Sequence, residues 1–333
     1  MQTNPPLLRH RLPLYRQKML VLFDQSMAVG SCKVLDPSKL SIWIKDFPLP
    51  RKETFWNQFP SHLHFQPESI LPLPEALPFS YPEIISITDS PSFKEWENSI
   101  TQFKSSGLEK VVLARKTTVT FKEAVSPVAL FHHLKKRSPN AFTFAVIFSP
   151  SLAFVGATPE KLFSRGDLHL ETEALAGTGP NFGPKEVREF LHVKEILTDQ
   201  LQKICNPFSI SQSFFIKKAG NVSHLHYPFS VKLKESIPDS ELIQFLHPTP
   251  AIGGRPRDLA LQFIHTHEPF DRGLYAGTFG ILSEKTSRVY VTIRSCMIEG
   301  NRMHIFTGAG ITPDSNPLHE WEELNHKRGL FDL

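Results

Sequence analysis

The sequence is poor in cysteine and lacks both long apolar runs and basic clusters. Its 333 residues contain three cysteines, Cys32, Cys205 and Cys296, and no CxxC pair. This scarcity argues against a disulfide framework and indicates a reducing compartment. No apolar run reaches the roughly 18 residues that a membrane-spanning helix requires. The net charge is +4 and is scattered along the chain, so we expect neither a membrane nor a nucleic-acid partner.

Residues 1–23 contain four basic side chains and no acidic one, which is a feature of transit peptides. Pro5, Pro6 and Pro13 in the same stretch oppose the amphipathic helix that such peptides form. We therefore expect a cytoplasmic protein.

Apolar residues are plentiful: they make up 40% of the sequence and include 27 phenylalanines, which is enough for a sizeable core. Short apolar runs at Met19–Phe23 and Leu40–Ile44 are strand candidates. Prolines between Pro67 and Pro82 favour an extended connector. We predict two regions, a proline-rich N-terminal portion packed on the core (residues 1–92) and a domain with the sharper helix and strand signals (residues 93–333).

From residue 93 onward the apolar pattern predicts defined helices and strands. The predicted helices are Phe93–Ser105, Gly183–Ile204 and Pro317–Lys327. The predicted strands are Lys110–Phe121, Phe142–Phe148, Ala153–Val155 and Leu168–Leu175, with a hairpin formed by Arg288–Ile298 and Arg302–Phe306. Runs of strands followed by helices, without strict alternation, favour an α+β fold with antiparallel sheets.

Two predicted helices each carry two glutamates three residues apart, Glu186 with Glu189 and Glu320 with Glu323. A spacing of three places both members of a pair on one helical face. Carboxylates converging from two elements supply the oxygen ligands that Mg²⁺ binds. The same spacing also fits two solvated acidic helix faces, so it leaves both interpretations open.

The predicted strand Arg288–Ile298 carries Arg294 on a polar face, because alternate side chains of a strand share a face. An arginine there could hold a carboxylate through two parallel hydrogen bonds. The following strand ends at Gly308 and Gly310, where missing side chains let backbone N–H groups approach an anion. An exposed sheet face and an ordinary turn are the alternative.

Lys110 and Glu173 are candidates for acid–base chemistry. Lys110 opens an apolar strand, and a lysine beside such a strand can lose its proton and act as a base. Glu173 has apolar neighbours, which can keep a carboxyl protonated so that it acts as an acid. A lysine that extends to solvent and an exposed glutamate would fit the same pattern.

Histidines are numerous but carry weaker signals. Three HxH pairs lack a cysteine or carboxylate at ligand spacing beside them, so zinc is not expected: His62 with His64, His224 with His226, and His265 with His267. His247 begins a rigid proline-containing loop, and by itself it would be a core or surface histidine.

Nine short blocks complete the pattern. They are KVVLAR (110–115), FVGATPEKLF (154–163), TEALAGT (172–178), KEVREFL (185–191), HPTPAIGG (247–254), EPFDRGLYAG (268–277), IRS (293–295), GAGI (308–311) and EWEELNHK (320–327). In this order they resemble the chorismate-binding enzyme family, which includes isochorismate, salicylate, anthranilate and aminodeoxychorismate synthases. The resemblance covers the chain from about residue 93 onward and implies one large α+β domain around a central buried site.

The resemblance also implies what each candidate residue binds, either Mg²⁺ or a part of chorismate. Mg²⁺ would be held by Glu189 and Glu323, with Glu186 and Glu320 as further acidic positions, against the ring carboxylate of chorismate. The other substrate-binding positions that match the family are Arg294, Tyr275, Gly308 and Gly310 around the enolpyruvyl carboxylate, Gly177, Thr178 and Lys327 near the ring carboxylate, and His247 near the reacting ring.

Two positions separate the subfamilies that the resemblance spans. Lys110 stands where ammonia-using members typically carry glutamine, and Ala176 where aminodeoxychorismate synthases often carry a nucleophilic lysine. The resemblance therefore implies a Mg²⁺-dependent isochorismate synthase of the menaquinone type. In it Lys110 would activate the water that attacks C2 of chorismate, and Glu173 would protonate the departing C4 hydroxyl.

A monomer without a glutamine amidotransferase subunit is the corresponding expectation. The main competing interpretation is a salicylate synthase, which also eliminates pyruvate from isochorismate. An anthranilate synthase-type lyase with an amidotransferase partner is a third interpretation, and a non-catalytic chorismate-binding protein is a fourth.

Overall fold

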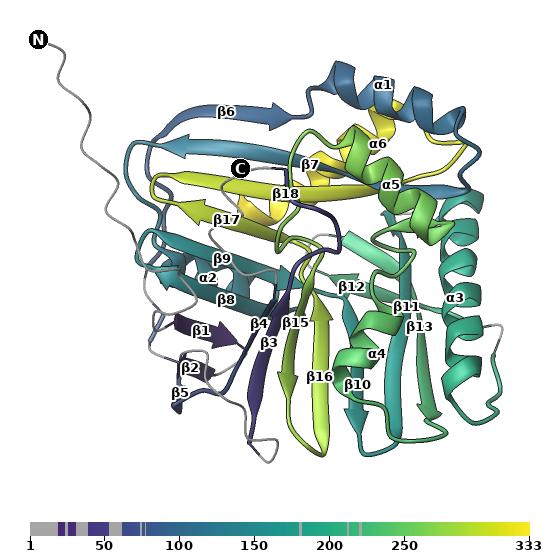
Figure 1. Cartoon of the computed structure of the whole chain (residues 1–333). Coiled ribbons are helices and arrows are strands. Elements are labelled where there is room, and N and C mark those ends of the chain that lie inside the picture. The colour runs from purple at the N-terminus through teal and green to yellow at the C-terminus, as the bar shows by residue number, and fades with distance from the viewer. Residues whose placement is uncertain are drawn as a thin grey trace, which may run out of the picture.

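The computed structural model describes residues 19–23, 26–30, 39–52, 62–73, 75–76, 78–179, 182–211, 213–219 and 222–333. These parts of the chain form two large antiparallel sheets and six α-helices (Figure 1). The predicted α+β class with large antiparallel sheets is therefore confirmed. Within the described ranges, no helix is both long and apolar enough to cross a membrane.

The first sheet has ten strands, which run across the view in Figure 1. They are β1 (Met19–Phe23), β2 (Ser26–Gly30), β5 (Ser69–Pro72), β6 (Ile84–Ser90), β7 (Lys110–Phe121), β8 (Phe142–Ser149), β9 (Leu152–Thr158), β14 (Gly254–Arg255), β17 (Ser295–Glu299) and β18 (Arg302–Ile311). Their order is β14-β7-β18-β17-β9-β8-β1-β2-β5, and β6 also pairs with β7. All six residues from Lys110 to Arg115 in β7 are buried, whereas burial alternates with partial exposure in the rest of that strand.

The second sheet has eight strands, which run up and down in Figure 1. They are β3 (Ser41–Lys45), β4 (His62–Phe65), β10 (Lys161–Gly166), β11 (His169–Gly179), β12 (Phe215–Ala219), β13 (Val222–Lys232), β15 (Thr278–Leu282) and β16 (Thr286–Val291). Their order is β12-β13-β11-β10-β16-β15-β3-β4. The N-terminal strands thus enter both sheets, since β1 pairs with β8 and β3 pairs with β15.

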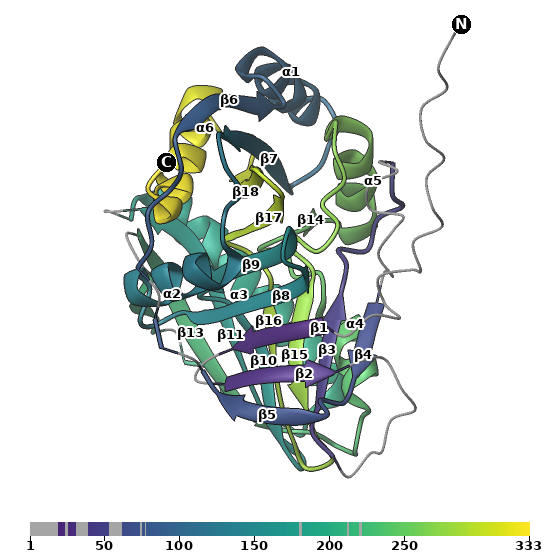
Figure 2. The same cartoon turned by 90° about the vertical axis from the view of Figure 1, so that its left-hand side faces the viewer.

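Phenylalanine rings join the two sheets into one core. The ring of Phe144 in β8 lies 5.5 Å, between centroids, from Phe154 in β9 and 5.5 Å from Phe279 in β15. In Figure 2, strands β8, β1, β2 and β5 cross in front of the second sheet. The apolar faces of the two sheets therefore cover each other, which buries the aromatic side chains that the sequence holds in excess.

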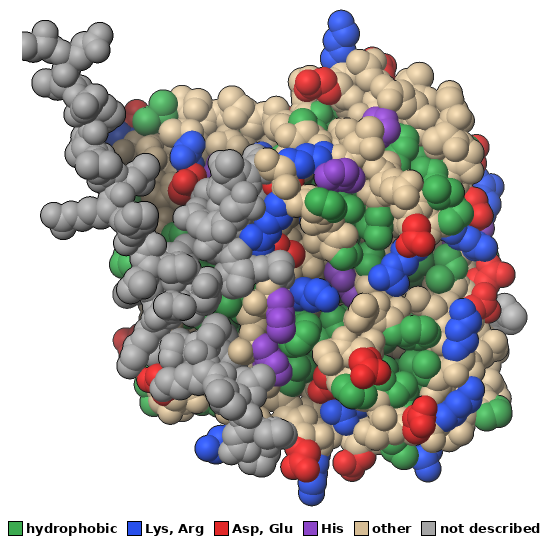
Figure 3. Space-filling view, in the orientation of Figure 1, with side chains coloured by type: hydrophobic (Ala, Val, Ile, Leu, Met, Phe, Trp, Pro, Cys, Tyr) green, Lys and Arg blue, Asp and Glu red, His purple; other side chains and the backbone are tan. Residues whose placement is uncertain are grey.

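The helices are α1 (Phe93–Lys104), α2 (Pro127–Arg137), α3 (Pro184–Ile204), α4 (Asp239–Leu246), α5 (Arg257–His267) and α6 (Pro317–Arg328). Helix α3 packs on β11 and α6 packs on β18, so each sheet receives one of the two helices that carry the predicted glutamate pairs. In Figure 1, α1, α5 and α6 surround β7 and β18 at the top of the molecule. On the face seen in Figure 3, acidic and basic side chains are interspersed.

Local signals explain why the predicted helices formed. Ser92 accepts a hydrogen bond from the N–H of Glu95 while the Glu95 carboxylate accepts one from the N–H of Ser92, which caps α1. Asn316 caps α6 through two backbone N–H groups, and Pro317 occupies its first turn. The predictions for α1, α3, α6 and β7 are confirmed to within one residue at each end.

The expectation of one strand from Arg288 to Ile298 is wrong. The chain leaves the second sheet after β16 at Val291 and enters the first sheet as β17 at Ser295. Arg294, at the crossing between sheets, has φ +52°. The alternation of side chains across a strand therefore does not apply to Arg294, whose orientation is set by the crossing.

Candidate active site

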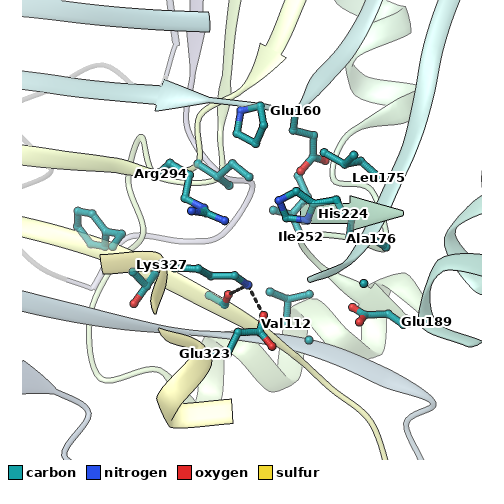
Figure 4. A pocket seen from close by; sticks show the side chains of 18 of the residues that line it. Val112, Glu160, Leu175, Ala176, Glu189, His224, Ile252, Arg294, Glu323 and Lys327 are labelled. Atoms are coloured by element: carbon teal, nitrogen blue, oxygen red, sulfur yellow. Dashed lines mark hydrogen bonds and ion pairs between the residues drawn. The ribbon is translucent and has the colours of Figure 1, made fainter. Parts of the chain in front are cut away.

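A cavity lies where the two sheets meet helices α3 and α6 (Figure 4). The space between its walls, including the part that is open to solvent, is about 680 Å³. Residues that line it include Val112, Thr307, Gly308 and Gly310 from the first sheet, Leu175, Gly177 and His224 from the second, Glu189, Glu323 and Lys327 from the helices, and Glu160, Tyr275 and Arg294 from the connections between strands.

The crossing of the chain between sheets creates this cavity. The pairing of β17 with β18 begins at Ser295, opposite Phe306, so β18 has no β17 partner beyond Phe306. Thr307, Gly308 and Gly310 of β18 remain paired with β7 beyond that point, and these three residues line the cavity. The polar residues of the site are therefore placed by a break in one sheet, which local sequence patterns do not reveal.

Lys110 does not itself line the cavity but forms an ion pair with Glu189, which does. The Nζ of Lys110 lies 2.7 Å from Oε1 of Glu189, and the Lys110 side chain is only 4% exposed. Gly310 makes room for the pair, because a Cβ atom at this position would lie 2.5 Å from Oε1 of Glu189. The lack of a side chain at position 310 thus leaves space for the Glu189 carboxylate, in addition to any contact that the Gly310 backbone makes with an anion.

A second lysine–glutamate pair lies on α6. The Nζ of Lys327 donates hydrogen bonds to Oε1 of Glu323 at 2.5 Å and to the carbonyl oxygen of Gly308 at 2.6 Å. In Figure 4 the guanidinium of Arg294 points into the same cavity as Lys327. Burial lowers the pKa of Arg294 to about 10, and the negative charge of Glu323 opposes that shift. Arg294 therefore remains cationic at neutral pH and is suited to an anionic ligand.

The structure brings two of the four expected metal-binding carboxylates to the cavity, Glu189 and Glu323. Glu186 caps its own helix instead, since its Oε2 accepts a hydrogen bond from the N–H of Gly183 at 2.8 Å. Glu320 is buried, away from the cavity wall. Among the described residues, no group of three or more His, Cys, Asp or Glu side chains could hold a metal.

Two carboxylates that face one cavity nevertheless fit Mg²⁺. This ion takes oxygen ligands, keeps several waters, and is commonly held by one or two protein carboxylates together with oxygens of the substrate. Glu189 and Glu323 are the residues that would hold it, since of the four expected ligands these two line the cavity.

Glu173 lies in surroundings that differ from those that its neighbours in the sequence predicted. It lies beside a neighbouring cavity and does not line the one that contains Glu189 and Glu323. Burial by itself would raise the pKa of Glu173, but a hydrogen bond from His226 and the charge of Lys217 outweigh it and hold the pKa below its usual value. These surroundings therefore favour the ionised form of Glu173 over the protonated form that the sequence predicted.

Glu160 has the properties that were expected of Glu173. It is 7% exposed and lines both cavities. Burial, reinforced by the negative charge of Glu173, raises the pKa of Glu160 to about 7. In Figure 4, Glu160 stands across the cavity from Glu189 and Glu323. The signal for Glu160 was present in the block FVGATPEKLF, but the sequence does not show that Glu160 is buried.

His224 is a second cavity residue that sequence patterns did not assign. It lines the cavity from β13, and burial together with the charges of Arg294 and Lys327 holds its pKa well below its usual value. A neutral imidazole is therefore expected at this wall. The HxH pair His224 and His226 was the only signal for it in the sequence.

Of the remaining expected substrate-binding residues, Gly177 and Tyr275 line the cavity and His247 does not. The Nε2 of His247 donates a hydrogen bond to the carbonyl oxygen of Ala276 at 2.8 Å, and burial lowers the His247 pKa to about 4. His247 thus supports the backbone of Ala276, which has φ +58°. The side chain of Thr178 lies outside the described part of the chain.

Two residues of the EPFDRGLYAG block, Glu268 and Arg272, stabilise the cavity wall through hydrogen bonds. Arg272 forms a buried bidentate pair with Glu268, at 2.9 Å and 2.6 Å. It also donates to the carbonyl oxygens of Val112 and Ile252, and Glu268 accepts from the N–H of Ala114. This ion pair therefore fixes the positions of two wall residues, Val112 and Ile252.

Comparison with known proteins identifies similar sequences and folds. Residues 74–330 match the family model described as chorismate binding enzyme. The chain is 35% identical over 256 residues to the isochorismate synthase MenF of Haemophilus influenzae, an alignment that covers 72% of this chain and 59% of that protein. The chain thus spans about three-fifths of that relative's length.

Two solved structures share the fold. The menaquinone-specific isochorismate synthase MenF of Escherichia coli matches with a TM-score of 0.76 and 26% identity, covering 98% of this chain and 92% of that one. Anthranilate synthase component I of Streptococcus pneumoniae matches with a TM-score of 0.73, covering 100% of this chain and 95% of that one. At 14% identity the second match concerns the fold alone.

Proposed function

Because this chain belongs to the chorismate-binding enzyme family, we propose that it converts chorismate to isochorismate in the cavity between its two sheets. The observation that carries the proposal is a buried lysine paired with a carboxylate of the cavity wall, and a buried carboxyl across the same cavity. Lys110 pairs with Glu189 on one wall, and Glu160, whose pKa burial raises to about 7, stands across from Glu189. Addition of water and loss of hydroxide at different ring carbons need a base and an acid that are separated in this way.

The cavity also suits a substrate that carries two carboxylates. Arg294 and Lys327 provide two cationic side chains, and Tyr275 provides a phenol on the same wall as Gly308. Arg294 can hold one carboxylate through two parallel hydrogen bonds. Mg²⁺ bound by Glu189 and Glu323 would supply positive charge to the other carboxylate.

The reaction moves one proton at each end of the substrate. Lys110, in its neutral form, accepts a proton from water, and the water oxygen forms a bond to C2 of the ring. The double bonds shift, and the bond between C4 and its hydroxyl oxygen breaks. Glu160 donates its proton to that oxygen, which leaves as water. One water enters and one leaves, so the product is an isomer of the substrate, and Glu160 replaces Glu173 in the acid role.

Lys110 also bears on the choice among related activities. A lysine favours water over ammonia as the nucleophile, because ammonia-using relatives typically carry glutamine at this position. We therefore expect no amidotransferase subunit, and we retain a monomer as the expected state. Similarity to MenF of H. influenzae and of E. coli favours the menaquinone pathway and, with it, a cytoplasmic location.

The decisive experiment incubates the protein with chorismate and Mg²⁺ in H₂¹⁸O, with and without ammonium, and identifies the products by chromatography and mass spectrometry. Isochorismate carrying one ¹⁸O is the expected product. Salicylate with pyruvate would instead identify a salicylate synthase, and anthranilate formed only with ammonium would identify the lyase. Absence of any product would leave a chorismate-binding protein. The variant Glu160→Gln should lose about 10²–10⁴-fold in kcat, since it retains shape but cannot donate the proton.

A further inference from the structure

A second cavity lies behind Glu160 and is lined by Glu173. Glu160 belongs to the walls of both cavities, so it separates the proposed substrate site from this second space. Glu173 is directed toward the second cavity, and its side chain is only 6% exposed. A buried carboxylate at this place is costly unless its charge is balanced, and the contacts that balance it also hold the segment that carries Glu160.

Glu173 and Lys217 hold the backbone on both sides of Glu160. Oε1 of Glu173 accepts a hydrogen bond from the N–H of Lys161, at 3.2 Å. The Nζ of Lys217 donates to both oxygens of Glu173 at 2.8 Å, and to the carbonyl oxygen of Pro159 at 3.3 Å. The residues before and after Glu160 are thus attached to one ion pair.

Three neighbouring strands carry the ion pair and a third residue, His226, that contacts it. Glu173 lies on β11, Lys217 on the edge strand β12, and His226 on β13 between them. The Nε2 of His226 donates to Oε2 of Glu173 at 2.8 Å. The carboxylate therefore receives donors from two strands and from the backbone of β10, which explains how it stays ionised while largely buried.

The charges around Glu160 come from a small set of residues. The charge of Glu173 raises its pKa, whereas Lys110 and Lys217 lower it, as does a hydrogen bond from Thr249. Helices α3 and α4 contribute uncharged side chains to the second cavity, namely Val193, Leu197, Gln200 and Leu246. Glu173 is therefore the group, besides burial itself, that favours the protonated form of Glu160.

We propose that Glu173, held by Lys217 and His226, is a positioning residue for the acid Glu160: it fixes the backbone of residues 159–161 and supplies the negative charge that keeps Glu160 able to donate a proton. This inference rests on the proposed function for its catalytic meaning. Its physical content, the effect of Glu173 on the protonation of Glu160, does not depend on which reaction the protein catalyses.

The first test is the variant Glu173→Gln, which keeps the side-chain size and removes the charge. Without that charge Glu160 loses its proton more easily, so the alkaline limb of the kcat–pH profile should move by about one pH unit to lower pH. Turnover at pH 8 should then fall about tenfold, because the protonated fraction falls tenfold per unit. KM for chorismate should stay within about twofold, since Glu173 does not line the substrate cavity.

A matched control and an opposite variant sharpen the test. Glu171→Gln removes a carboxylate from the same strand that is 50% exposed and contacts Lys161 through its side chain, and it should leave the profile unchanged. Lys217→Met removes a positive charge near Glu160, so its alkaline limb should move to higher pH, and Lys217→Arg should restore it. Limbs that stay in place, or that move in the same direction in Glu173→Gln and Lys217→Met, would overturn the inference.

A second readout separates this inference from the proposed function. The carboxyl carbon of Glu160 can be followed by NMR in ¹³C-glutamate-labelled protein and assigned by its loss in Glu160→Gln. Its titration midpoint should fall in Glu173→Gln whether or not chorismate is converted. An unchanged midpoint in a protein that makes isochorismate would refute the inference alone. A lowered midpoint in a protein that makes no product would refute the proposed function alone.

Discussion

Oε1 of Glu189 lies 2.7 Å from Nζ of Lys110, so a proposed metal ligand and the proposed base form one ion pair. The arrangement repeats at Glu323, whose carboxylate is paired with Lys327. Each carboxylate suited to Mg²⁺ therefore has a lysine beside it. An ion pair of this kind couples the binding of a cation to the charge of the lysine.

Replacement of the base tests the catalytic assignment. We expect Lys110→Gln to lose about 10²–10⁴-fold in kcat, because glutamine cannot accept a proton from water. The surface variant Lys122→Gln is the control, since Lys122 is 65% exposed and pairs with the exposed Glu83. Steady-state rates and circular dichroism would be measured for both. A Lys110→Gln enzyme that turns over at the normal rate would remove Lys110 from the mechanism.

Removal of Mg²⁺ tests the paired carboxylates. Chelation by EDTA should abolish turnover, and readdition of Mg²⁺ should restore it. Glu323→Gln should weaken Mg²⁺ binding by at least tenfold in calorimetry, because one of two anionic ligands is lost. Glu186→Gln should bind Mg²⁺ as the unaltered protein does, since Glu186 caps its own helix. Equal losses in the two variants would restore Glu186 as a ligand.

The raised pKa of Glu160 predicts a pH-dependent stability difference. An ordinary glutamate has a pKa of 4.5, whereas burial raises that of Glu160 to about 7. The folded protein binds this proton more tightly, so the associated stability is present below pH 4.5 and is lost as the pH rises through about 7. Glutamine has no proton to lose. Glu160→Gln should therefore gain stability relative to the unaltered protein between pH 5 and 8, by up to about 3 kcal/mol.

Urea denaturation at several pH values would measure that difference. Glu171→Gln serves as the control, because burial contributes little at an exposed carboxylate. A stability difference that does not change with pH would mean that Glu160 titrates in the folded protein as an ordinary glutamate does.

The buried pair of Glu268 and Arg272 should matter for stability. Arg272→Met leaves the Glu268 carboxylate buried without its partner, and we expect a loss of about 3–5 kcal/mol in the free energy of unfolding. The comparable pair of Glu299 and Arg302 is exposed, so Arg302→Met should cost about 1 kcal/mol or less. Equal effects in denaturant titrations would mean that burial of the first pair is unimportant.

Gly310 tests the steric origin of the site. A methyl group there would lie 2.5 Å from Oε1 of Glu189, so Gly310→Ala should displace that carboxylate and reduce turnover about tenfold or more. Gly166→Ala is the matched control, because nothing lies within 4 Å of the added atom. Normal kinetics in Gly310→Ala would show that Glu189 can shift without consequence.

Local signals in the sequence determined the elements and the family. The apolar run from Lys110 to Phe121 became β7, and the cap at Asn316 with Pro317 began α6 as predicted. These signals act between residues close in the chain, through side-chain alternation and backbone capping, so they can be read without the fold. The order of the nine blocks identified the family for the same reason, since it is a property of the chain alone.

The tertiary structure alone decided which of the two glutamates, Glu160 or Glu173, has a raised pKa. The neighbours of Glu173 along the chain suggested a raised pKa, yet Lys217 and His226, which stabilise its ionised form, lie 44 and 53 residues away from it. A pKa depends on burial and on charges brought close in space, which sequence spacing does not encode. Arg294 shows the same limit, because strand alternation predicts a side chain's direction only where the strand continues, and here the chain changes sheets.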